Sequence, residues 1–567
     1  MKGIYRLLVC SFMAVSLAGC ASGTGSAAAG KYTPGTYTGT ADGYGGPVTV
    51  EITVDANSVT DVKITGDKET AAVGGAALEE LTKQVKDKQS AVIDGVSGAT
   101  YTSTAVKEAA LQALNEAMGI TATAAPTAAA AEAVTASGIK QGVGIVSTPR
   151  LGPGKDEKET PVYSFNETVA YVITDSEDKI VDLEVDVLEV ITPNHDASNE
   201  EDNFLAGWPG QTYSSDDDGD GKINGDLAET EDIFTSELGT WTTKRQKGDA
   251  YKLNSGTWTQ EMDIFENFFK GKTVSEIKDW YAKYCSDVNG RPLTDKSDKD
   301  EDVAKYGKLT DDEKKTNDLV SGATMSVHDA HGDIIGAIEK AVNNAKPVET
   351  AASIKKLGLG IKVTPRLGPG KDDKDVPVYS FNTVVDGMAF DADGKIVSMY
   401  TDILEVITPN HDGADDNSFT GWPGQSYNAD TNADGKVEEV YTQTEDTFQA
   451  QISKFTTKRD LGDKYKMNSG TWTEEISAYE GAMLGKTTAE VDEWFKTYFS
   501  DVNGRALHGT SDKDEDKTKY AALTDDQKKE IDSISSATMS LSDAHGDIIG
   551  TIDQAYANAK DTDITVK

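Results

Sequence analysis

A long internal repeat constrains the fold of this chain more than any other feature of its sequence. The shift between matching segments is 216 positions at first and 214 after a deletion of two residues. The matching segments include 148–156 with 364–372, 191–196 with 407–412, and 254–259 with 468–473. A repeat of this length is the size of a whole domain, so one hydrophobic core cannot organise the chain. The sequence predicts two tandem copies of one domain, at 140–346 and 356–562.

A second pattern connects these copies to the region before them. Asp-x-x-Ser-(Gly or Ser)-Ala-Thr ends each copy and also occurs once upstream. Such a pattern is uncommon by chance in a chain of 567 residues, so three matches indicate a site. Its residues are Asp94, Ser97, Gly98, Ala99 and Thr100 upstream, Asp318, Ser321, Gly322, Ala323 and Thr324 in the first copy, and Asp532, Ser535, Ser536, Ala537 and Thr538 in the second.

Each motif ends in a threonine that we expect just before a helix. After Thr100, apolar residues recur at helical spacing as far as Ala117. In the copies, the expected capping pairs are Ser326 with Asp329 and Ser540 with Asp543. The unpaired N–H groups at a helix start favour a phosphate, so the pattern predicts a phosphate site. The alternative is a set of small-residue turns that lead into helix caps.

The motif resembles the covalent flavinylation motif of the FMN-binding domain family, found in the C subunit of sodium-pumping NADH:quinone oxidoreductase and the G subunit of the Rnf complex. In that family a flavin transferase esterifies the phosphate of FMN onto the last threonine. The resemblance implies up to three covalent FMN groups, on Thr100, Thr324 and Thr538. Residues 31–119 resemble the small domain almost throughout. The copies resemble multi-flavin lipoproteins of extracellular electron transfer chiefly in the motif, and Ser536 replaces the usual glycine.

Alternating apolar and polar residues predict one order of elements in all three regions. A β-hairpin is expected at 48–64, at 169–187 and at 388–403, each followed by the motif and a helix. The hairpin and the motif are about 50 residues apart upstream and about 150 apart in the copies, so the copies contain an insertion of about a hundred residues. The predicted fold class is α+β, with three FMN-binding domains that each combine an antiparallel sheet with packed helices.

Each insertion contains an acidic loop with the ligand spacing of a calcium site. Oxygen-bearing side chains occupy positions 1, 3 and 5, and glycine occupies position 6. Position 12 is Leu227 or Tyr441, so a carboxylate such as Glu231 or Glu445 would have to complete the site. A solvated acidic turn is the alternative. The candidate ligand positions are Asp216, Asp218, Asp220 and Lys222 in the first loop, and Asp430, Asn432, Asp434 and Lys436 in the second.

The first twenty residues have the pattern of an export signal. Lys2 and Arg6 precede an apolar stretch that is too short to span a bilayer and ends in Leu-Ala-Gly-Cys. This ending resembles a bacterial lipoprotein signal, which implies cleavage before Cys20 and a lipid on its sulfur; an ordinary secretory signal is the alternative. The predicted organisation is a signal at 1–19, a tether at 20–30, the small domain at 31–119, an Ala/Thr-rich linker at 120–139, the first copy at 140–346, a linker at 347–355 and the second copy at 356–562.

The charge of the chain excludes one large class of partners. Against 55 Lys and Arg there are 96 Asp and Glu, which gives a net charge of -41. This charge opposes binding to nucleic acid or to anionic lipid by general electrostatic attraction. A lipid on Cys20 would hold such an acidic chain at a membrane without charge attraction.

Other residues that recur or stand out give weaker signals. We interpret the histidines after Thr-Pro-Asn as loop residues and Arg150 and Arg366 as ion-pair partners, with a phosphate clamp as the alternative. Trp258 and Trp472 are expected in the core, and Cys285 is expected to be a buried apolar filler whose place Phe499 takes in the second copy. His195 and His411 are the loop histidines, and His331 and His545 are expected on helices with their side chains in solvent.

Together these patterns predict an exported, lipid-anchored electron carrier without catalytic residues. A flavin transferase would mature it, a membrane NADH or quinol oxidoreductase would reduce it, and an external acceptor would oxidise it. The main alternative is a calcium-dependent binding or adhesion lipoprotein without redox activity. A reductase with its own diffusible substrate is a further alternative, which would need a pocket with convergent polar groups.

Overall fold

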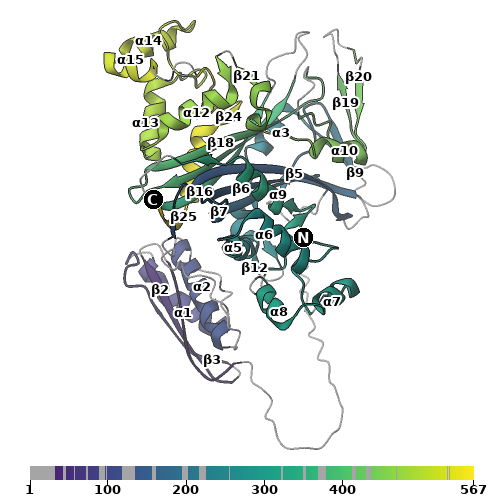
Figure 1. Cartoon of the computed structure of the whole chain (residues 1–567), viewed down its shortest axis with the longest axis vertical. Coiled ribbons are helices and arrows are strands. Elements are labelled where there is room, and N and C mark those ends of the chain that lie inside the picture. Colours follow the sequence, from purple (N-terminus) through teal and green to yellow (C-terminus); the bar gives the residue numbers. More distant parts are fainter. Residues whose placement is uncertain are drawn as a thin grey trace, which may run out of the picture. The chain divides into compact units, whose positions relative to one another are not determined.

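The structure is a computed structural model that divides into two compact units, 1–128 and 129–567 (Figure 1). No helix in the part of the chain that it describes is both long and apolar enough to cross a bilayer. The described residues are 32–42, 46–56, 58–71, 74–88, 93, 96, 99–117, 134–155, 161–194, 202–215, 225–253, 256–295, 297–318, 320, 323–348, 353–367, 378–411, 417–429, 436–437, 439–467, 469–532, 534 and 537–566.

The first unit is a three-stranded antiparallel sheet with two packed helices. Its strands are β1 (Gly35–Asp42), β2 (Pro47–Val54) and β3 (Val59–Thr65), in the order β1-β2-β3. Helix α1 (Gly74–Lys88) packs on β3, and α2 (Thr100–Ala117) packs on β1 and β2. The alternating residues of β2 and the apolar stripe of α2 are buried in one core. The predicted hairpin and the helix after the motif are therefore confirmed.

Two five-stranded sheets form the centre of the second unit. The first sheet has the order β15 (Lys346–Pro347), β5 (Lys140–Lys155), β6 (Pro161–Thr174), β7 (Ile180–Ile191) and β8 (Asn203–Phe204). The second has the order β18 (Ile396–Ile407), β17 (Ser380–Phe390), β16 (Ile354–Arg366), β25 (Lys560–Val566) and β4 (Val134–Ala136). Neighbouring strands are antiparallel, except for the parallel pairs β7–β8 and β25–β4. The predicted hairpins of this unit are confirmed as β6–β7 and β17–β18.

Each of these sheets is covered on both faces. On β6, Phe165 and Val169 point into a core that the first sheet shares with the second, whereas Val172 points toward the helices. On β17, Phe381 enters the shared core and Met388 faces the helices of the other side. Such two-sided burial explains why these strands are apolar almost throughout. The second unit is thus layered as helices, sheet, sheet and helices.

The helices and short hairpins follow the same order after each long hairpin. Helix α9 packs on β5 and β6, and α16 packs on β16 and β17. The first series is β9 (Thr212–Ser215), β10 (Gly225–Ala228), α3 (Glu231–Leu238), α4 (Lys244–Lys247), β11 (Lys252–Leu253), β12 (Gly256–Thr257), α5 (Trp258–Phe269), α6 (Val274–Tyr284), α7 (Asp300–Tyr306), α8 (Asp311–Asp318), β13 (His328–Asp329), β14 (Gly332–Asp333) and α9 (Ile334–Asn343). The second is β19 (Ser426–Ala429), β20 (Glu439–Thr442), α10 (Glu445–Ile452), α11 (Lys458–Leu461), β21 (Lys466–Met467), β22 (Gly470–Thr471), α12 (Trp472–Met483), α13 (Thr488–Tyr498), α14 (Asp514–Ala522), α15 (Asp525–Asp532), β23 (Ser542–Asp543), β24 (Gly546–Asp547) and α16 (Ile548–Ala557).

Reciprocal hydrogen bonds join the two repeated segments. The indole N–H of Trp208 donates to the carbonyl of Phe419 at 2.6 Å, and that of Trp422 donates to the carbonyl of Leu205 at 2.6 Å. Both tryptophans are fully buried. The partners correspond by the shift of 214, so this contact has the self-complementary form of a two-fold interface, here within one chain.

Two predicted boundaries differ from the structure. The linker expected at 120–139 contains β4, whose residues pair in parallel with the last residues of β25. Strand β25 itself continues to Val566, beyond the expected end of the second copy. The ends of the repeated region therefore close one sheet together, a long-range pairing that composition does not reveal.

Candidate functional site

The motif threonine of the first segment is bound by a buried glutamate. Glu261 lies in the first turn of α5 and is 1% exposed. The hydroxyl of Thr324 donates to its Oε1 at 2.9 Å. The N–H groups of Thr324 and Met325 donate to its Oε2 at 2.6 and 2.9 Å. One carboxylate therefore accepts hydrogen bonds from the hydroxyl and from two consecutive backbone N–H groups.

The second segment repeats this arrangement at Thr538. Its hydroxyl donates to Oε1 of Glu475 at 3.1 Å, and the N–H groups of Thr538 and Met539 donate to Oε2 at 2.7 and 2.8 Å. Glu475 lies in the first turn of α12, as Glu261 does in α5, and it is 3% exposed. The N-terminus of a helix stabilises a negative charge. Both glutamates thus sit where an anion is favoured, next to the motif hydroxyl.

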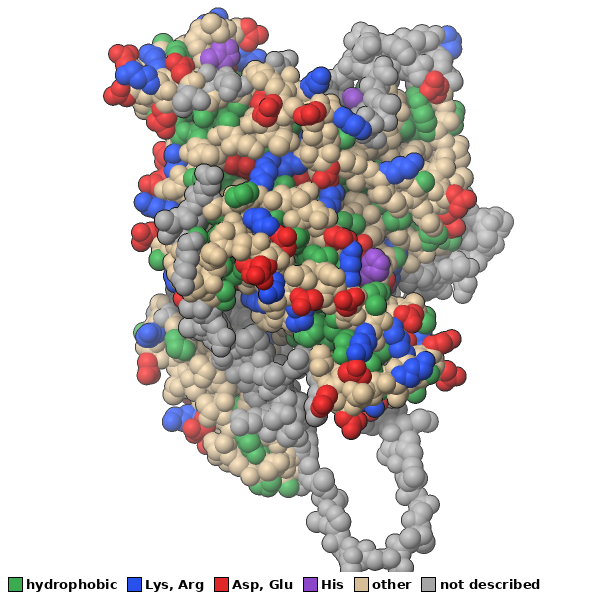
Figure 2. Space-filling model, viewed as in Figure 1, with side chains coloured by type: hydrophobic (Ala, Val, Ile, Leu, Met, Phe, Trp, Pro, Cys, Tyr) green, Lys and Arg blue, Asp and Glu red, His purple; other side chains and the backbone are tan. Residues whose placement is uncertain are grey.

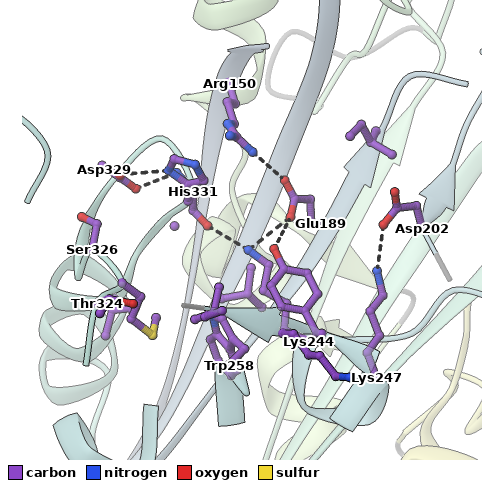
Figure 3. Close-up of a pocket in the computed structure, with 18 of the residues that line it drawn as sticks. Arg150, Glu189, Asp202, Lys244, Lys247, Trp258, Thr324, Ser326, Asp329 and His331 are labelled. Carbon is purple, nitrogen blue, oxygen red and sulfur yellow. Dashed lines mark hydrogen bonds and ion pairs between the residues drawn. The ribbon is translucent and has the colours of Figure 1, made fainter. Parts of the chain in front are cut away.

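A cavity of about 620 Å³ opens beside Thr324 (Figure 3). It receives Arg150 from β5, Glu189 from β7, Lys244 and Lys247 from α4, and Trp258 from the start of α5. Lys252, Tyr251 and Arg291 also line it. The cavity thus combines an aromatic ring with several cations, close to a hydroxyl group.

The cations of this cavity are organised around Glu189. Arg150 and Lys244 each reach its carboxylate at 3.2 Å, and the hydroxyl of Tyr251 donates to it at 3.3 Å. Burial alone would raise the pKa of Glu189, but Lys244 and Arg150 lower it to about 2. Burial would lower the pKa of Lys244, and Glu189 raises it above its usual value. Both groups therefore carry their charge at neutral pH.

The second segment contains the same charged cluster. Arg366 and Lys458 each approach Glu405 at 3.2 Å, and Tyr465 donates to it at 3.5 Å. Burial is again outweighed by Lys458 and Arg366, so that the pKa of Glu405 falls to about 2. The ion pairs expected for the two arginines are confirmed.

The expected helix caps after the threonines are wrong. Thr324 lies ten residues before α9, and the hairpin β13–β14 stands between them. The caps of α9 and α16 are Asp333 and Asp547, in place of Ser326 with Asp329 and Ser540 with Asp543. Ser326 instead accepts a hydrogen bond from the N–H of His328 in a turn. A serine three residues before an acid was mistaken for a capping box because the same residues favour turns.

The histidines after the motif therefore lie in turns and not on helices. Nδ1 of His331 is 2.9 Å from Asp329, and Nδ1 of His545 is 2.9 Å from Asp543. His331 lines the cavity, and its carbonyl accepts a hydrogen bond from Lys244 at 3.3 Å. The histidine backbone thus positions the buried lysine of the cluster.

Much of the predicted motif lies outside the described residues. This holds for Asp94, Ser97, Gly98, Ser321, Gly322, Ser535 and Ser536. Ala99, Ala323 and Ala537 are buried, and Asp318 and Asp532 end α8 and α15. Thr100 opens α2, and two residues later the hydroxyl of Thr102 donates to the buried Glu69. A buried glutamate next to the motif therefore occurs in all three regions.

The candidate calcium ligands also lie outside the described residues, apart from Lys436. Each loop joins a pair of short antiparallel strands, β9–β10 or β19–β20. Glu231 and Glu445 were suggested as more distant calcium ligands. Their carboxylates accept hydrogen bonds from the phenol hydroxyls of Tyr379 and Tyr163, respectively, both at 2.9 Å. Among the described residues, no group of three or more His, Cys, Asp or Glu is arranged to hold a metal.

The tryptophans and the cysteine expected in the core lie there. Trp258, Trp472 and Cys285 are buried, and burial raises the pKa of the Cys285 thiol. Phe499 is buried at the place of Cys285 in the second segment. Cys20 and His195 lie outside the described residues, and the N–H of His411 donates to the carbonyl of Thr408 in a loop.

Glu261, Glu189 and Lys244 were missed by reasoning from the sequence. The signal that could have revealed them is the repeat itself, because Glu475, Glu405 and Lys458 stand at the same shifts. Charged residues that recur within apolar strands and helices are expected to be paired.

Comparisons with known proteins identify the small unit. The model of the FMN-binding domain family matches residues 43–115. The chain is 31% identical over 228 residues to chlorophenol reductase of Desulfitobacterium hafniense, which covers 39% of this chain and 62% of the relative.

Two shorter similarities concern proteins named as redox enzymes. They are NADH:acrylate oxidoreductase of Vibrio harveyi, 32% identical over 89 residues, and urocanate reductase of Eggerthella lenta, 33% identical over 106 residues. These matches cover 16% and 18% of this chain but only 9% and 17% of the relatives. The chain thus spans less than two thirds of the length of the curated relatives named here. Residues 43–115 thus match the FMN-binding domain family, and they form one FMN-binding domain of this chain.

Proposed function

We propose that the chain is an electron-transfer flavoprotein that carries FMN on Thr100, Thr324 and Thr538 through phosphoester bonds. The observation that carries this proposal is the environment of Thr324 and Thr538. At each, a hydroxyl and two backbone N–H groups converge on one anionic group. Forming a threonine ester of a phosphate needs the hydroxyl, and the neighbouring N–H donors would favour the negative charge of the phosphate.

The cavity beside Thr324 fits a flavin in size and chemistry. Its volume lies within the range of roughly 300–1,000 Å³ that small-ligand sites occupy. Lys247, Lys252 and Arg291 add positive charge to its lining, and Trp258 offers an aromatic surface. Bound FMN would supply one- or two-electron transfer, while these residues would hold and orient it.

The packing of the helix after each motif supports one architecture for the three regions. Helix α2 covers β1 and β2, α9 covers β5 and β6, and α16 covers β16 and β17. In each case the helix follows the motif and packs on the first two strands of its long antiparallel meander. We therefore extend the FMN-binding assignment from residues 43–115 to the two repeated segments, as tandem domains with a large insertion.

The cellular role is proposed from the sequence and from the relatives' names. We propose a lipid anchor at Cys20, maturation by a flavin transferase, a membrane NADH or quinol oxidoreductase as donor, and an external acceptor. On the face drawn in Figure 2, acidic and basic side chains are interspersed. Docking would then rest on local contacts of each flavin site. A calcium-dependent binding lipoprotein remains the alternative function.

Reduction of the flavin-loaded protein in membranes tests the carrier role. Thr100→Ala is expected to slow the reduction of the remaining flavins by a membrane quinol or NADH oxidoreductase, because the small domain follows the proposed anchor. Chemical reduction by dithionite should be unchanged, which controls for damage to the other flavins. Membrane-driven reduction at the wild-type rate would contradict this order, and flavins that never cycle would favour the binding protein.

A further inference from the structure

The proposed function assigns no role to Glu261 and Glu475. Both nevertheless contact the threonine hydroxyl that the proposed modification would convert to an ester. Each carboxylate is almost fully buried and accepts from a motif hydroxyl at 2.9 or 3.1 Å. Each also accepts hydrogen bonds from the N–H groups of the motif threonine and of the residue after it. These three donors are the groups nearest to a phosphate placed on Oγ.

The chemistry of ester formation requires a proton acceptor at this position. A threonine hydroxyl is a weak nucleophile and is activated by a base within about 2.6–3.2 Å of its oxygen. Oε1 of Glu261 and Oε1 of Glu475 lie at such distances, and the hydroxyl already directs its proton toward them. The nearby histidines of the described segments, His331 and His545, are instead paired with Asp329 and Asp543.

We propose that Glu261 and Glu475 are the general bases that activate Thr324 and Thr538 for flavin attachment, an inference that rests on the proposed function. As Oγ attacks the flavin phosphate, its proton passes to the carboxylate. The carboxylate also keeps the two N–H donors in place until the incoming phosphate takes them over. The acceptor protein therefore supplies part of the catalytic machinery for its own modification.

The balance of the reaction defines the class of the flavin donor. Joining free FMN to a hydroxyl in water releases water and is unfavourable, so the donor must contain a phosphoric anhydride. The P–Oγ bond forms and the P–O bond of the anhydride breaks. The second phosphate leaves with the electron pair, and the glutamate receives the proton. No oxidant or reductant is needed, and a flavin dinucleotide meets this requirement.

The presence of two sites in one molecule provides an internal control. The protein, Glu261→Gln and Glu475→Gln are each incubated with a flavin transferase and a flavin dinucleotide, and the modification of Thr324 and Thr538 is followed by peptide mass spectrometry. Glu261→Gln is expected to slow modification of Thr324 by about 100-fold or more while Thr538 reacts at the wild-type rate. Glu475→Gln should produce the reverse.

Two further measurements separate a base from a structural anchor. Glu261→Asp retains the carboxylate and should recover part of the rate, whereas Glu261→Gln retains only hydrogen bonding. The pH profile of the rate at Thr324 should differ between the wild type and Glu261→Gln, whereas the profiles of the two proteins at Thr538 should coincide. If Glu261→Gln is destabilised, the Asp variant and its pH profile still test the base.

The outcomes distinguish failure of this inference from failure of the proposed function. Equal rates at Thr324 in wild type and Glu261→Gln would overturn the base and leave the attachment site intact. Equal slowing of Thr324 and Thr538 in Glu261→Gln would also overturn it, because the effect would then be global. A wild-type protein that receives no flavin at either threonine would overturn the proposed function itself.

Discussion

The two repeated segments agree at the motif and differ in what surrounds it. The glutamate on the threonine and the buried lysine and glutamate of the cluster are identical, with nearly equal distances. The support behind the motif differs, since Phe265 in the first segment corresponds to Tyr479 in the second. The hydroxyl of Tyr479 donates to the carbonyls of Ala537 and Met539 at 3.0 and 3.2 Å. The second motif therefore has an additional anchor.

A second difference lies at the contact between the segments. Glu229 and Glu237 occupy the positions of Gln443 and Gln451, whose amides hydrogen-bond at 2.6 Å. Two ionised carboxylates cannot form that bond. Burial and the neighbouring Glu237 raise the pKa of Glu229 to about 8, and burial raises that of Glu237 to about 7. The comparison teaches that Glu189 and Glu405 stay charged near neutral pH in both segments, whereas the charges of Glu229 and Glu237 depend on pH.

The largest predicted loss of stability comes from removing the buried lysine that each segment has in its charged cluster. Lys244→Met or Lys458→Met removes one of the two cations paired with the buried Glu189 or Glu405 and leaves Arg150 or Arg366 to balance its charge. The loss of unfolding free energy should therefore be about 3 kcal/mol, the lower end of the range for a broken buried pair. Denaturant unfolding measures the loss, and the two variants should behave alike. Adding Glu189→Gln to Lys244→Met should restore part of the stability. If the two variants lose very different amounts of unfolding free energy, the two clusters are not equivalent.

The next largest effect is a pH dependence of stability that comes from Glu229 and Glu237, the acidic pair at the contact between the segments. Because their folded pKa values are raised, Glu229 and Glu237 bind protons in the folded state that the unfolded state has released. Stability should therefore fall as the pH rises from about 4.5 to about 8, by less than the roughly 1.4 kcal/mol per unit of pKa shift of a fully buried group, because solvent partly screens both carboxylates. Glu229→Gln/Glu237→Gln, which copies the second segment, should reduce this slope in melting curves. Other buried acids such as Glu184 retain a part of it, since burial raises its pKa to about 8.

The control for this prediction is the amide pair itself. Gln443→Glu/Gln451→Glu should introduce a similar pH dependence into the second segment. If the double glutamine variant keeps the full wild-type slope between pH 5 and 8.5, the contact is not the source of the pH dependence.

A smaller effect is expected from the extra anchor of the second motif. Tyr479→Phe removes one donor from two carbonyls and should cost about 1 kcal/mol. It should also make the N–H groups of Thr538 and Met539 exchange hydrogen faster, as measured by hydrogen–deuterium exchange. The N–H groups of Thr324 and Met325 in the same sample are the control. Unchanged exchange at Thr538 would show that Tyr479 does not support the motif.

The smallest effect is predicted for the acidic loops. If they bind calcium, a chelator should lower the melting temperature by a few degrees, because an ion that binds only the folded state stabilises it. Asp220→Ala with Asp434→Ala should abolish this sensitivity. Wild-type melting that a chelator leaves unchanged would return both loops to solvated turns of the hairpins β9–β10 and β19–β20.

The local patterns of the sequence predicted the local parts of the fold. The alternation in 48–64 predicted β2 and β3, and the apolar stripe after Thr100 predicted α2, because both patterns report burial of one face. The core between the two large sheets was not predicted. Strands such as β6 and β17 are apolar on both faces, and such a pattern does not say what covers the second face.

The candidate site was predicted only as far as its continuous segment. The motif identified Thr324, but Glu261 comes from a helix 63 positions upstream, and only the folding of the insertion brings the two together. The cluster around Glu189 also brings together three elements that are distant in sequence, β5, β7 and α4. Side chains that meet through long-range packing leave no spacing pattern in the sequence. Here the signal in the sequence is that the same residues recur in the second segment.

The central claim, that the motif threonines carry covalent FMN, is tested most directly by intact mass spectrometry of denatured protein produced with a flavin transferase. The account predicts up to three added masses, each of one FMN less one water. Thr100→Ala, Thr324→Ala and Thr538→Ala should each remove one, and partial occupancy at Thr538 would fit the serine at 536. A yellow protein that releases all of its flavin on denaturation, or retains three after these substitutions, would contradict the claim.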